Sequence, residues 1–400
     1  MRQDPLEYLS SELQALRQQG LYRRLRVLDD EQKARTSIDG RLVVNLSSNN
    51  YLGLTTHPKL RERALEATRA LGVGSGSVRT IAGTMQIHME LERKLAAFKR
   101  TEAAVVFQSG FAANAGTVSS ILGPDAVIVS DELNHASIID GARLSRATIK
   151  VFPHRDVAAA RRIVEALPRA TRTLIITDGV FSMDGDLGAL PELCDLADEF
   201  GCIMMVDDAH ASGVFGSNGR GTVDHFGVHG RVDVQVGTLS KAVGALGGYV
   251  AGSRALIEFL CRRARPFLFS TSHPPAVAAT CLAAIEVLED EPQLIERLWD
   301  NTRFFKTGLN ALGFNTGASE SPITPVIVGE AERAMTLSDR LFDKGVFAQG
   351  IGFPTVPHGK ARVRTIVTAS HTREELQFAL DCFQAVGTEL GVIGTCRGLR

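Results

Sequence analysis

Seven short apolar segments alternate with helical patterns between residues 103 and 252, and this alternation limits the possible folds more than any other feature. Segments rich in β-branched residues predict strands at 103–107, 126–130, 149–152, 172–177, 202–206, 233–237 and 248–252. Helical patterns between them cover 110–122, 136–144, 156–166 and 190–200. Strands separated by helices pair in parallel, with helices on both faces of the sheet. The pattern therefore predicts an α/β fold with a mostly parallel, doubly wound, seven-stranded sheet.

The segments on either side of this core predict two smaller units. After Pro5, an amphipathic helix that stops at Gly20 is indicated by Leu6, Leu9, Leu13 and Leu16. A strand at 42–46 and a helix from Pro58 follow. Beyond the core, helices at 274–289 and 291–312 end the alternation, and an α+β pattern begins with strands near 325–328, 346–348 and 362–366 and helices at 331–344 and 372–390. We expect an N-terminal segment (1–48), a large domain (49–286) and a small C-terminal α+β domain (287–400).

Composition narrows the class of protein. With 44% hydrophobic residues in 400, the chain can bury a large core. Its 44 basic and 45 acidic residues are interspersed, which argues against nucleic acid or an anionic membrane as a partner and favours small-molecule chemistry. The first residues lack the apolar core of a signal peptide, and no run approaches the roughly twenty apolar residues of a membrane span, so a cytoplasmic protein is expected. The six cysteines lack CxxC spacing, so neither a metal site nor a disulfide framework is expected.

Two of the predicted strands end in residues that suit pyridoxal 5'-phosphate (PLP). Lys241 follows the strand at 233–237 among small residues, where burial would lower its pKa and favour the unprotonated amine that condenses with the cofactor aldehyde. Asp207 ends the strand at 202–206 and can hold a proton on the pyridine nitrogen, which PLP needs to withdraw electrons. His210, three residues later, could reach the ring hydroxyl. The pair predicts a PLP site, although a lone lysine at a strand end is more often a solvated flank.

Other strand ends offer partners for the same cofactor. The segment Ser109-Gly110-Phe111 opens a helix, whose free N–H groups can hold a phosphate, and Thr238 adds a hydroxyl. His135 follows another strand and can lie flat on the pyridine ring. Ser182 could reach the O3' atom of the cofactor or the substrate, whereas its Asp-Gly neighbours are usually only turn residues.

Two arginines in the C-terminal domain suit a carboxylate. Arg362 and Arg364 share one face of a strand, and a guanidinium binds a carboxylate in a bidentate manner. Such pairs are commonly exposed charges.

The order and spacing of these motifs resemble the α-oxoamine synthases of fold type I along nearly the whole chain. The matching segments are 49–53, 134–141, 177–185, 206–210, 219–221, 238–241, 265–270 and 354–364. Members condense a small amino acid with an acyl-CoA, releasing CoA and usually CO2. The resemblance implies a homodimer with shared active sites.

The resemblance also implies a role for each site residue. Lys241 would bind PLP covalently and act as a base, Asp207 would face the pyridine nitrogen, His135 would stack on the ring, and His210 and Ser182 would contact O3'. The phosphate would be held by Gly110, Phe111 and Thr238, with Ser270 and Thr271 from the neighbouring subunit. The substrate would be bound by Asn50, Asn134 and Arg364.

The substrate pair is less constrained. Segments 134–141, 177–185 and 265–270 look most like glycine C-acetyltransferase, also called 2-amino-3-ketobutyrate CoA ligase, and favour glycine with acetyl-CoA in threonine and glycine metabolism. Segments 109–114 and 270–275 look more like 8-amino-7-oxononanoate synthase, which uses L-alanine and pimeloyl-CoA in biotin synthesis. Ser240, where the ligase commonly has Gly, also departs from the first pattern. A dual-type enzyme fits this mixture, with a dedicated 8-amino-7-oxononanoate synthase as the alternative.

Three other readings have weaker support. A serine palmitoyltransferase-type enzyme differs in tunnel-lining residues that the sequence does not identify. An aminotransferase would share Lys241 and Asp207, but segments 134–141 and 177–185 disfavour it. A non-catalytic regulator or scaffold predicts loss of the lysine or an added DNA-binding region, and neither occurs.

Overall fold

The central sheet contains seven strands in the order β3-β9-β8-β7-β6-β4-β5. The structure, a computed structural model, describes residues 4–18, 22 and 24–394. Strand β9 lies antiparallel to β3 and β8, and the other neighbours pair in parallel. The strands are β3 Ala103–Phe107, β4 Val127–Asp131, β5 Thr148–Phe152, β6 Thr173–Asp178, β7 Ile203–Asp207, β8 Val234–Thr238 and β9 Gly248–Gly252. The predicted mostly parallel, seven-stranded sheet is confirmed.

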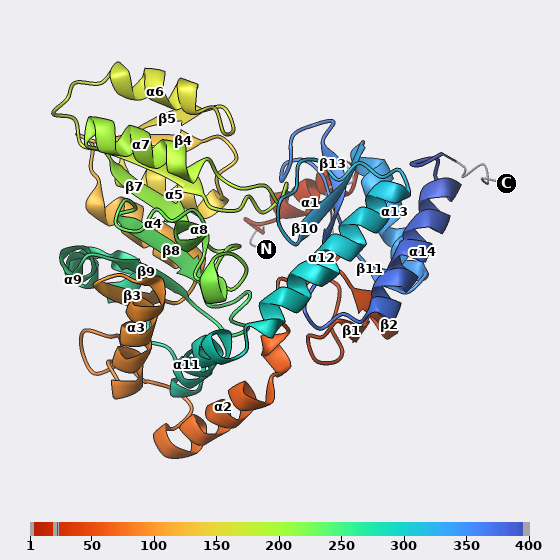
Figure 1. Ribbon diagram of the computed structural model, residues 1–400, viewed down its shortest axis with the longest axis horizontal. Helices are drawn as coiled ribbons and strands as arrows, with labels where there is room; N and C mark the ends of the chain where they lie inside the picture. Colours follow the sequence, from red (N-terminus) through yellow and green to blue (C-terminus); the bar gives the residue numbers. More distant parts are fainter. Residues whose placement is uncertain (1–3, 19–21, 23, 395–400) are drawn as a thin grey trace.

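Helices cover both faces of this sheet (Figure 1). Alternate residues of a strand point to opposite faces, so Val105 and Phe107 pack in one core cluster and Ala104 and Val106 in another. The first cluster includes residues of α4 Gly110–Ile121, α5 Ala136–Ser145 and α9 Arg254–Arg263. The opposite face is covered by α3 Gln86–Lys99, α6 Val157–Glu165, α7 Leu190–Phe200 and α11 Pro275–Asp290. Burial on both faces explains why the strands are almost continuously apolar.

The large lobe also contains elements that the sequence pattern did not predict. Helices α3 and α9 lie outside the predicted ranges, as do the short helices α8 Thr222–His225 and α10 Arg265–Leu268 and the 3₁₀ turns at Leu54–Thr56 and Ser217–Gly219. Helix α2 Pro58–Leu71 begins at the predicted proline, which occupies the first turn. It packs against α11.

The carboxyl ends of the parallel strands meet at one edge of the sheet. Strands β4, β6, β7 and β8 end there in Asp131, Asp178, Asp207 and Thr238. Asp178 and Asp207 are register partners in neighbouring strands. In open α/β sheets, ligands bind in the crevice outside this edge. The topology therefore brings distant sequence motifs together.

The C-terminal part forms a second lobe, at the right of Figure 1. An antiparallel sheet in the order β10-β13-β12 packs with three helices around its own apolar core. Its elements are α12 Gln293–Ala311, β10 Ile323–Gly329, α13 Ala331–Asp343, β11 Val346–Phe347, β12 Gln349–Ile351, β13 Ala361–Ile366 and α14 Arg373–Glu389. The N-terminal hairpin of β1 Arg35–Ile38 and β2 Arg41–Asn45 joins this lobe, because β2 pairs in parallel with β11.

Helix α1 Tyr8–Gln18 matches the predicted amphipathic helix, but none of its residues is buried. Leu9, Leu13 and Leu16 each remain more than a third exposed. The predicted stop at Gly20 lies outside the described residues.

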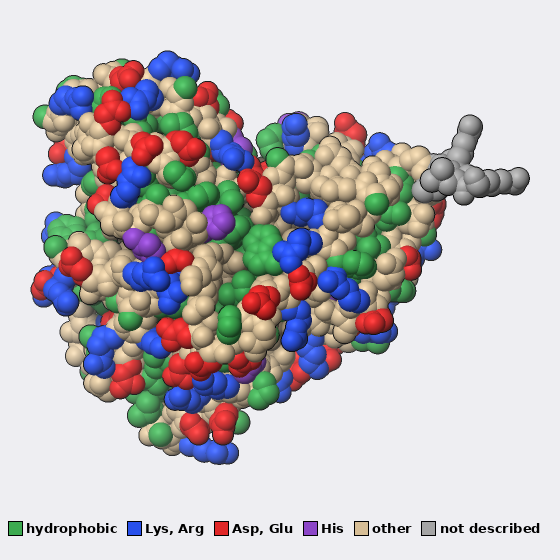
Figure 2. Space-filling model, in the orientation of Figure 1, with side chains coloured by type: hydrophobic (Ala, Val, Ile, Leu, Met, Phe, Trp, Pro, Cys, Tyr) green, Lys and Arg blue, Asp and Glu red, His purple; other side chains and the backbone are tan. Residues whose placement is uncertain are grey.

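The surface has both signs of charge. Figure 2 shows basic and acidic side chains interspersed over the visible face. Within the described residues, no helix combines the length and the apolar character that spanning a membrane requires. The five cysteines in this part of the chain are free, and Cys396 lies outside it.

Candidate active site

A cavity of about 200 Å³ lies at the carboxyl edge of the large sheet. Eight of the predicted site residues line it: Gly110, Phe111, His135, Ser182, Asp207, His210, Thr238 and Lys241. They come from segments that are distant in sequence and follow β3, β4, β6, β7 and β8. The fold thus brings the predicted cofactor residues together.

Lys241 lines the cavity just beyond the end of β8. Burial lowers its pKa from 10.5 to about 8, although the nearby Asp207 and Asp178 carboxyl groups oppose the change. The charge of Arg364 lowers the pKa further. A neutral amine is therefore accessible near neutral pH, as nucleophilic attack on an aldehyde requires.

Asp207 has a fixed orientation at the end of β7. Its Oδ2 accepts a hydrogen bond from Asn114 Nδ2 at 2.6 Å, and its Oδ1 accepts one from the Ala209 N–H at 2.8 Å. Asn114 also donates to the Ser137 hydroxyl at 2.9 Å. Asn114 had no predicted role. It lies four residues after Gly110 on the same helix, and this spacing places both residues on the face toward the site. A carboxylate held in this way can face a cationic ring nitrogen.

His135 precedes α5 and is oriented by that helix. Its Nδ1 accepts the Ser137 N–H at 3.2 Å and lies 2.7 Å from the Ser137 hydroxyl. Burial lowers its pKa below 6.5 despite the nearby Asp207. The lowered pKa favours the neutral ring even though part of the side chain is exposed, and acceptance of the Ser137 N–H at Nδ1 leaves the proton of the neutral ring on Nε2.

His210 is a buried residue of the cavity lining. The Tyr51 hydroxyl lies 2.7 Å from its Nδ1. Burial, together with the charges of Lys241 and Arg364, holds the pKa of His210 well below its usual value. A neutral His210 ring can donate a hydrogen bond to a phenolic oxygen from one nitrogen and accept one at the other. Tyr51 was not assigned a role, although it belongs to the 49–53 segment.

The part of the cavity formed by the start of α4 suits a phosphate. Helix α4 begins here, and Ser109 caps it by accepting the Ala112 N–H at 3.0 Å. The first N–H groups of a helix have no intrahelical partner and attract anions. The Thr238 hydroxyl lies 2.7 Å from that of Ser240, which also lines the cavity. Gly110, Phe111, Thr238 and Ser240 thus form a neutral, donor-rich pocket.

Asp178 is a cavity residue that the sequence analysis did not single out. It is buried, and its Oδ1 has no hydrogen-bond partner among the described residues. Burial, followed by the negative charge of Asp207, raises the pKa of Asp178 well above its ordinary value. The surroundings of Asp178 therefore favour its neutral form beside the hydrogen-bonded carboxyl group of Asp207.

None of the three predicted substrate residues lines the cavity, and the amides of Asn134 and Asn50 are already engaged. The Asn134 amide donates to the Ser130 hydroxyl and the Ile176 carbonyl and accepts the Asp178 N–H. The Asn50 amide is similarly engaged, with the Gln32 carbonyl and Thr55. In this structure, both amides support the backbone around the site.

Arg364, Ser270 and Thr271, the remaining predicted residues, do not line the cavity. Arg364 is close enough to affect the pKa of Lys241 and His210, donates to Asn49 Oδ1 at 3.3 Å, and leaves its Nε without a partner in the described part of the chain. Ser270 is half-buried and Thr271 exposed. Neither reaches the cavity of its own chain.

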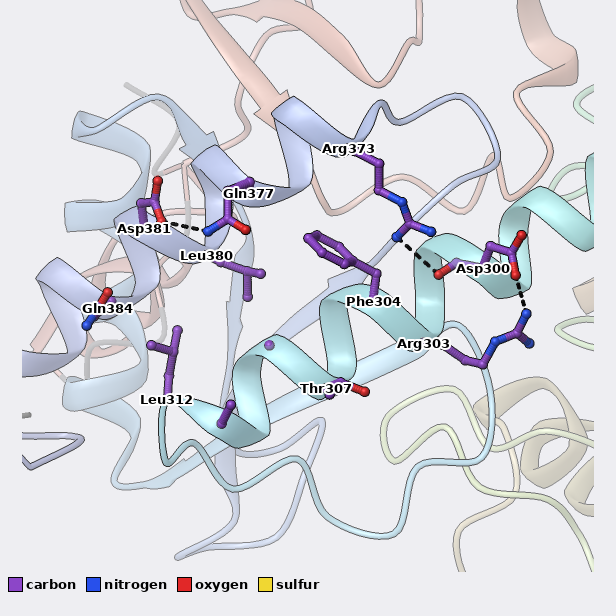
Figure 3. A pocket seen from close by; sticks show the side chains of 12 residues that line it. Asp300, Arg303, Phe304, Thr307, Leu312, Arg373, Gln377, Leu380, Asp381 and Gln384 are labelled. Atoms are coloured by element: carbon purple, nitrogen blue, oxygen red, sulfur yellow. Dashed lines mark hydrogen bonds and ion pairs between the residues drawn. The ribbon is translucent and has the colours of Figure 1, made fainter. Parts of the chain in front are cut away.

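A larger hollow of about 640 Å³ lies elsewhere, between α12 and α14. Figure 3 shows its side chains, where Arg373 bonds the Asp300 carbonyl and Gln377 bonds Asp381. It contains none of the predicted site residues. Size alone therefore does not locate the chemistry.

The cavity groups fit PLP. Lys241 supplies an amine of lowered pKa, Asp207 a fixed anion, and the start of α4 a phosphate pocket. Fold and site together define the class, the PLP-dependent enzymes of fold type I. The model of the class I and II aminotransferase family matches residues 41–383. The chain belongs to this family and to its α-oxoamine synthase branch.

Curated relatives point to one branch member. The chain is 62% identical over 388 residues to an 8-amino-7-oxononanoate synthase of Symbiobacterium thermophilum, covering 97% of this chain and 99% of that one. It is 53% identical over 387 residues to 8-amino-7-oxononanoate synthase 1 of Bacillus subtilis, with the same coverage. These relatives favour the alternative in the sequence analysis over glycine with acetyl-CoA.

Solved structures agree on the fold. A serine palmitoyltransferase of S. paucimobilis with bound PLP superimposes with a TM-score of 0.93 at 34% identity, covering 98% of this chain and 100% of that one. An 8-amino-7-oxononanoate synthase of Francisella tularensis gives 0.75 at 26% identity, covering 88% and 99%. PLP is therefore the cofactor of this family fold.

Proposed function

We propose that the protein is an 8-amino-7-oxononanoate synthase that condenses L-alanine with pimeloyl-CoA. The observation that carries the proposal is the 62% identity over nearly the whole length to a relative of that name. The cavity supports the reaction class, because its groups match those that PLP-dependent carbon–carbon bond formation requires.

The reaction balances without an oxidant or reductant. A bond forms between the alanine Cα and the acyl carbon, and the thioester C–S bond breaks. CoA leaves as its thiol after taking a proton. The alanine carboxylate leaves as CO2, and a proton takes its place on Cα.

The side chains divide the work. Bound PLP withdraws electrons from the Cα of the attached amino acid. Lys241 would remove and return the Cα proton, which its lowered pKa favours. Asp207, held by Asn114 and the Ala209 N–H, would be the carboxylate that faces the pyridine nitrogen. The Nε2 proton of His135 is available to the thioester oxygen as negative charge develops there.

Arg364 would bind the amino-acid carboxylate. Its guanidinium is partly buried, has a buried Nε without a partner among the described residues, and is close enough to Lys241 to lower the pKa of that amine. A partly buried cation without a full set of acceptors favours an incoming anion. Asn49 holds one Nη and orients the group.

Ser270 and Thr271 would complete the phosphate pocket of a second copy, so a homodimer is part of the proposal. Exposed apolar residues occur beside Ser270 and elsewhere in the large lobe: Phe269 is 69% exposed, Leu246 51% and Phe111 48%. Large exposed apolar side chains, where they cluster, are typical of a protein interface.

Release of CoA by the purified PLP-loaded enzyme tests the proposal. L-alanine, glycine and L-serine are each combined with acetyl-, pimeloyl- and palmitoyl-CoA, and kcat/KM is compared. We expect L-alanine with pimeloyl-CoA to give the highest value and release CO2. A higher value for glycine with acetyl-CoA would instead establish the glycine C-acetyltransferase reaction, and for L-serine with palmitoyl-CoA the third candidate.

A further inference from the structure

The loop that carries Ser182 is fixed by the C-terminal lobe rather than by its own domain alone. This loop, residues 180–187, leaves the end of β6 and closes with a bridge between Val180 and Leu187. Ser182 faces the cavity. The residues that follow it turn toward the C-terminal lobe, where four contacts hold them.

Arg362 on β13 makes the central contacts. Its Nη1 donates to Asp184 Oδ1 at 2.6 Å and to the Met183 carbonyl at 2.9 Å. The Arg362 side chain is only 3% exposed, whereas Asp184 is 34% exposed. The guanidinium therefore holds both the backbone and a side chain of the loop directly after Ser182.

Glu320 makes the other two contacts. Its N–H donates to the Gly185 carbonyl at 3.0 Å, and its carboxylate accepts the Leu187 N–H at 3.1 Å. Gly185 has φ +75°, and a Cβ there would lie 2.4 Å from the Ile323 carbonyl oxygen. The close approach leaves no room for a side chain, so the fit between loop and lobe is tight.

The same strand also carries Arg364. Residues two apart in a strand share a face, and Val363 between them packs instead into the core of the C-terminal lobe. Strand β13 therefore carries both Arg364, whose charge affects Lys241, and Arg362, which holds the loop of the cavity-lining Ser182. An isolated surface pair would contribute little, but here the Arg362 side chain is buried and one of its contacts is to a backbone carbonyl.

We infer that Arg362 is a positioning residue that ties the Ser182 loop to β13 and so fixes Ser182 relative to Arg364. The inference rests on the proposed contact of Ser182 with the cofactor. It concerns a residue that would itself touch neither PLP nor substrate. Arg362 would act only through the loop.

A double-mutant cycle tests the inference. Arg362→Met removes the charge and the donors while keeping a long side chain, and Ser182→Ala removes the hydroxyl that Arg362 would place. The PLP dissociation constant is measured for wild type, both single variants and the double variant. We expect each single variant to raise it about tenfold, and Arg362→Met to have little further effect when Ser182 is already Ala.

Controls separate positioning from general damage. Arg340→Met removes an exposed arginine of the same lobe, paired with Glu389 at 3.8 Å, and should leave the constant unchanged. Arg362→Lys keeps one donor and should restore part of the affinity. If Arg362→Met does not fold, as judged by the melting of the apoprotein, Asp184→Ala goes through the same cycle.

The outcomes are distinct. Equal losses from Arg362→Met in both Ser182 backgrounds, or no effect of Ser182→Ala, would overturn the inference. PLP binding involves neither substrate, so a wrong choice of amino acid or acyl-CoA leaves the cycle readable. In steady-state turnover, Arg362→Met should lower kcat and raise the KM for L-alanine together.

Discussion

At the scale of single residues, Lys241 combines a buried position with an ionisable amine, and the conflict between the two has a measurable consequence. Below pH 8, folding buries its charge. Between about 8 and its ordinary value of 10.5, the folded chain holds a neutral amine and the unfolded chain a charged one. The unfolded state then binds more protons, so this residue's contribution to stability rises with pH.

Lys241→Met should therefore stabilise the apoprotein near neutral pH. Removal of the buried charge is expected to add up to about 3 kcal/mol to the free energy of unfolding. The gain should shrink as pH rises from 8 toward 10.5. Urea unfolding at several pH values measures it, and a difference between the two apoproteins that stays constant with pH would contradict the lowered pKa. The same variant should lose covalent PLP and all turnover.

Asp178 and Asp207 are neighbours with opposite expected charge states. Asn resembles a protonated carboxyl group, so Asp178→Asn should lower kcat less than tenfold. Asp207→Asn removes the anion opposite the ring nitrogen and should lower kcat by about 10²–10³. Steady-state kinetics with PLP in excess make the comparison. A loss for Asp178→Asn as large as that for Asp207→Asn would show that Asp178 works as a charged group.

The sequence identified some site residues more easily than others. Lys241, Asp207, His135 and Thr238 end or follow apolar strands, and parallel pairing brings strand ends to one edge. Tyr51 and Asn114 reach the site from a loop and from within a helix, so no strand end marks them.

At the scale of secondary structure, a buried ion pair connects α3 to the turn after β7. Lys99 Nζ lies 3.0 Å from Asp208 Oδ2 and also donates to the Arg220 carbonyl, and both side chains are at most 1% exposed. Asp208 also accepts hydrogen bonds from the N–H and hydroxyl of Thr222. The pair thereby anchors the turn that carries His210.

Lys99→Met should destabilise the protein by about 3–5 kcal/mol, because Asp208 would remain buried without its cation. Adding Asp208→Asn should recover part of the loss. Arg231→Met, which removes exposed pairs with Asp195 and Asp198, is the matched control and should cost at most about 1 kcal/mol. Urea unfolding of the wild type and the three variants measures these changes. A loss of stability for Lys99→Met no larger than that of Arg231→Met would refute the role of the buried ion pair.

The elements differ in how clearly the sequence marks them. The seven strands of the large sheet begin and end within one residue of their predicted positions, because each is a short apolar run bounded by polar residues. Helix α3 was missed, although its buried Leu91, Leu95 and Phe98 recur at helical spacing. Its many charges between these positions, with Glu92 and Lys99 buried as ion pairs, obscure the apolar face.

At the scale of the whole molecule, a single copy of the chain does not explain two predicted features. Helix α1 has an exposed row of leucines, and Ser270 and Thr271 lie outside the cavity of their own chain. The local sequence pattern does not show the role of either feature, because both roles depend on what covers the surface of the chain. A second copy with shared active sites would account for both.

Mixing two inactive variants tests this arrangement. Lys241→Ala lacks the amine but keeps Ser270 and Thr271, while Ser270→Asp/Thr271→Asp keeps the amine but places negative charge where the partner's phosphate would bind. If sites are shared, a mixed dimer has one site with both defects and one intact site. Equal mixing with free exchange of subunits should restore about a quarter of wild-type activity.

The control mixes two variants whose defects both lie in the part of the site that one chain supplies. Lys241→Ala mixed with Asp207→Asn leaves one defect in each site of a mixed dimer, because both residues line the cavity of their own chain. That mixture should show no activity beyond its components. Different affinity tags on the two variants, with recovery of both chains through one tag, confirm that mixed dimers form. If the first mixture stays inactive although mixed dimers are present, each chain builds its site alone, and the exposed face of α1 then needs another explanation.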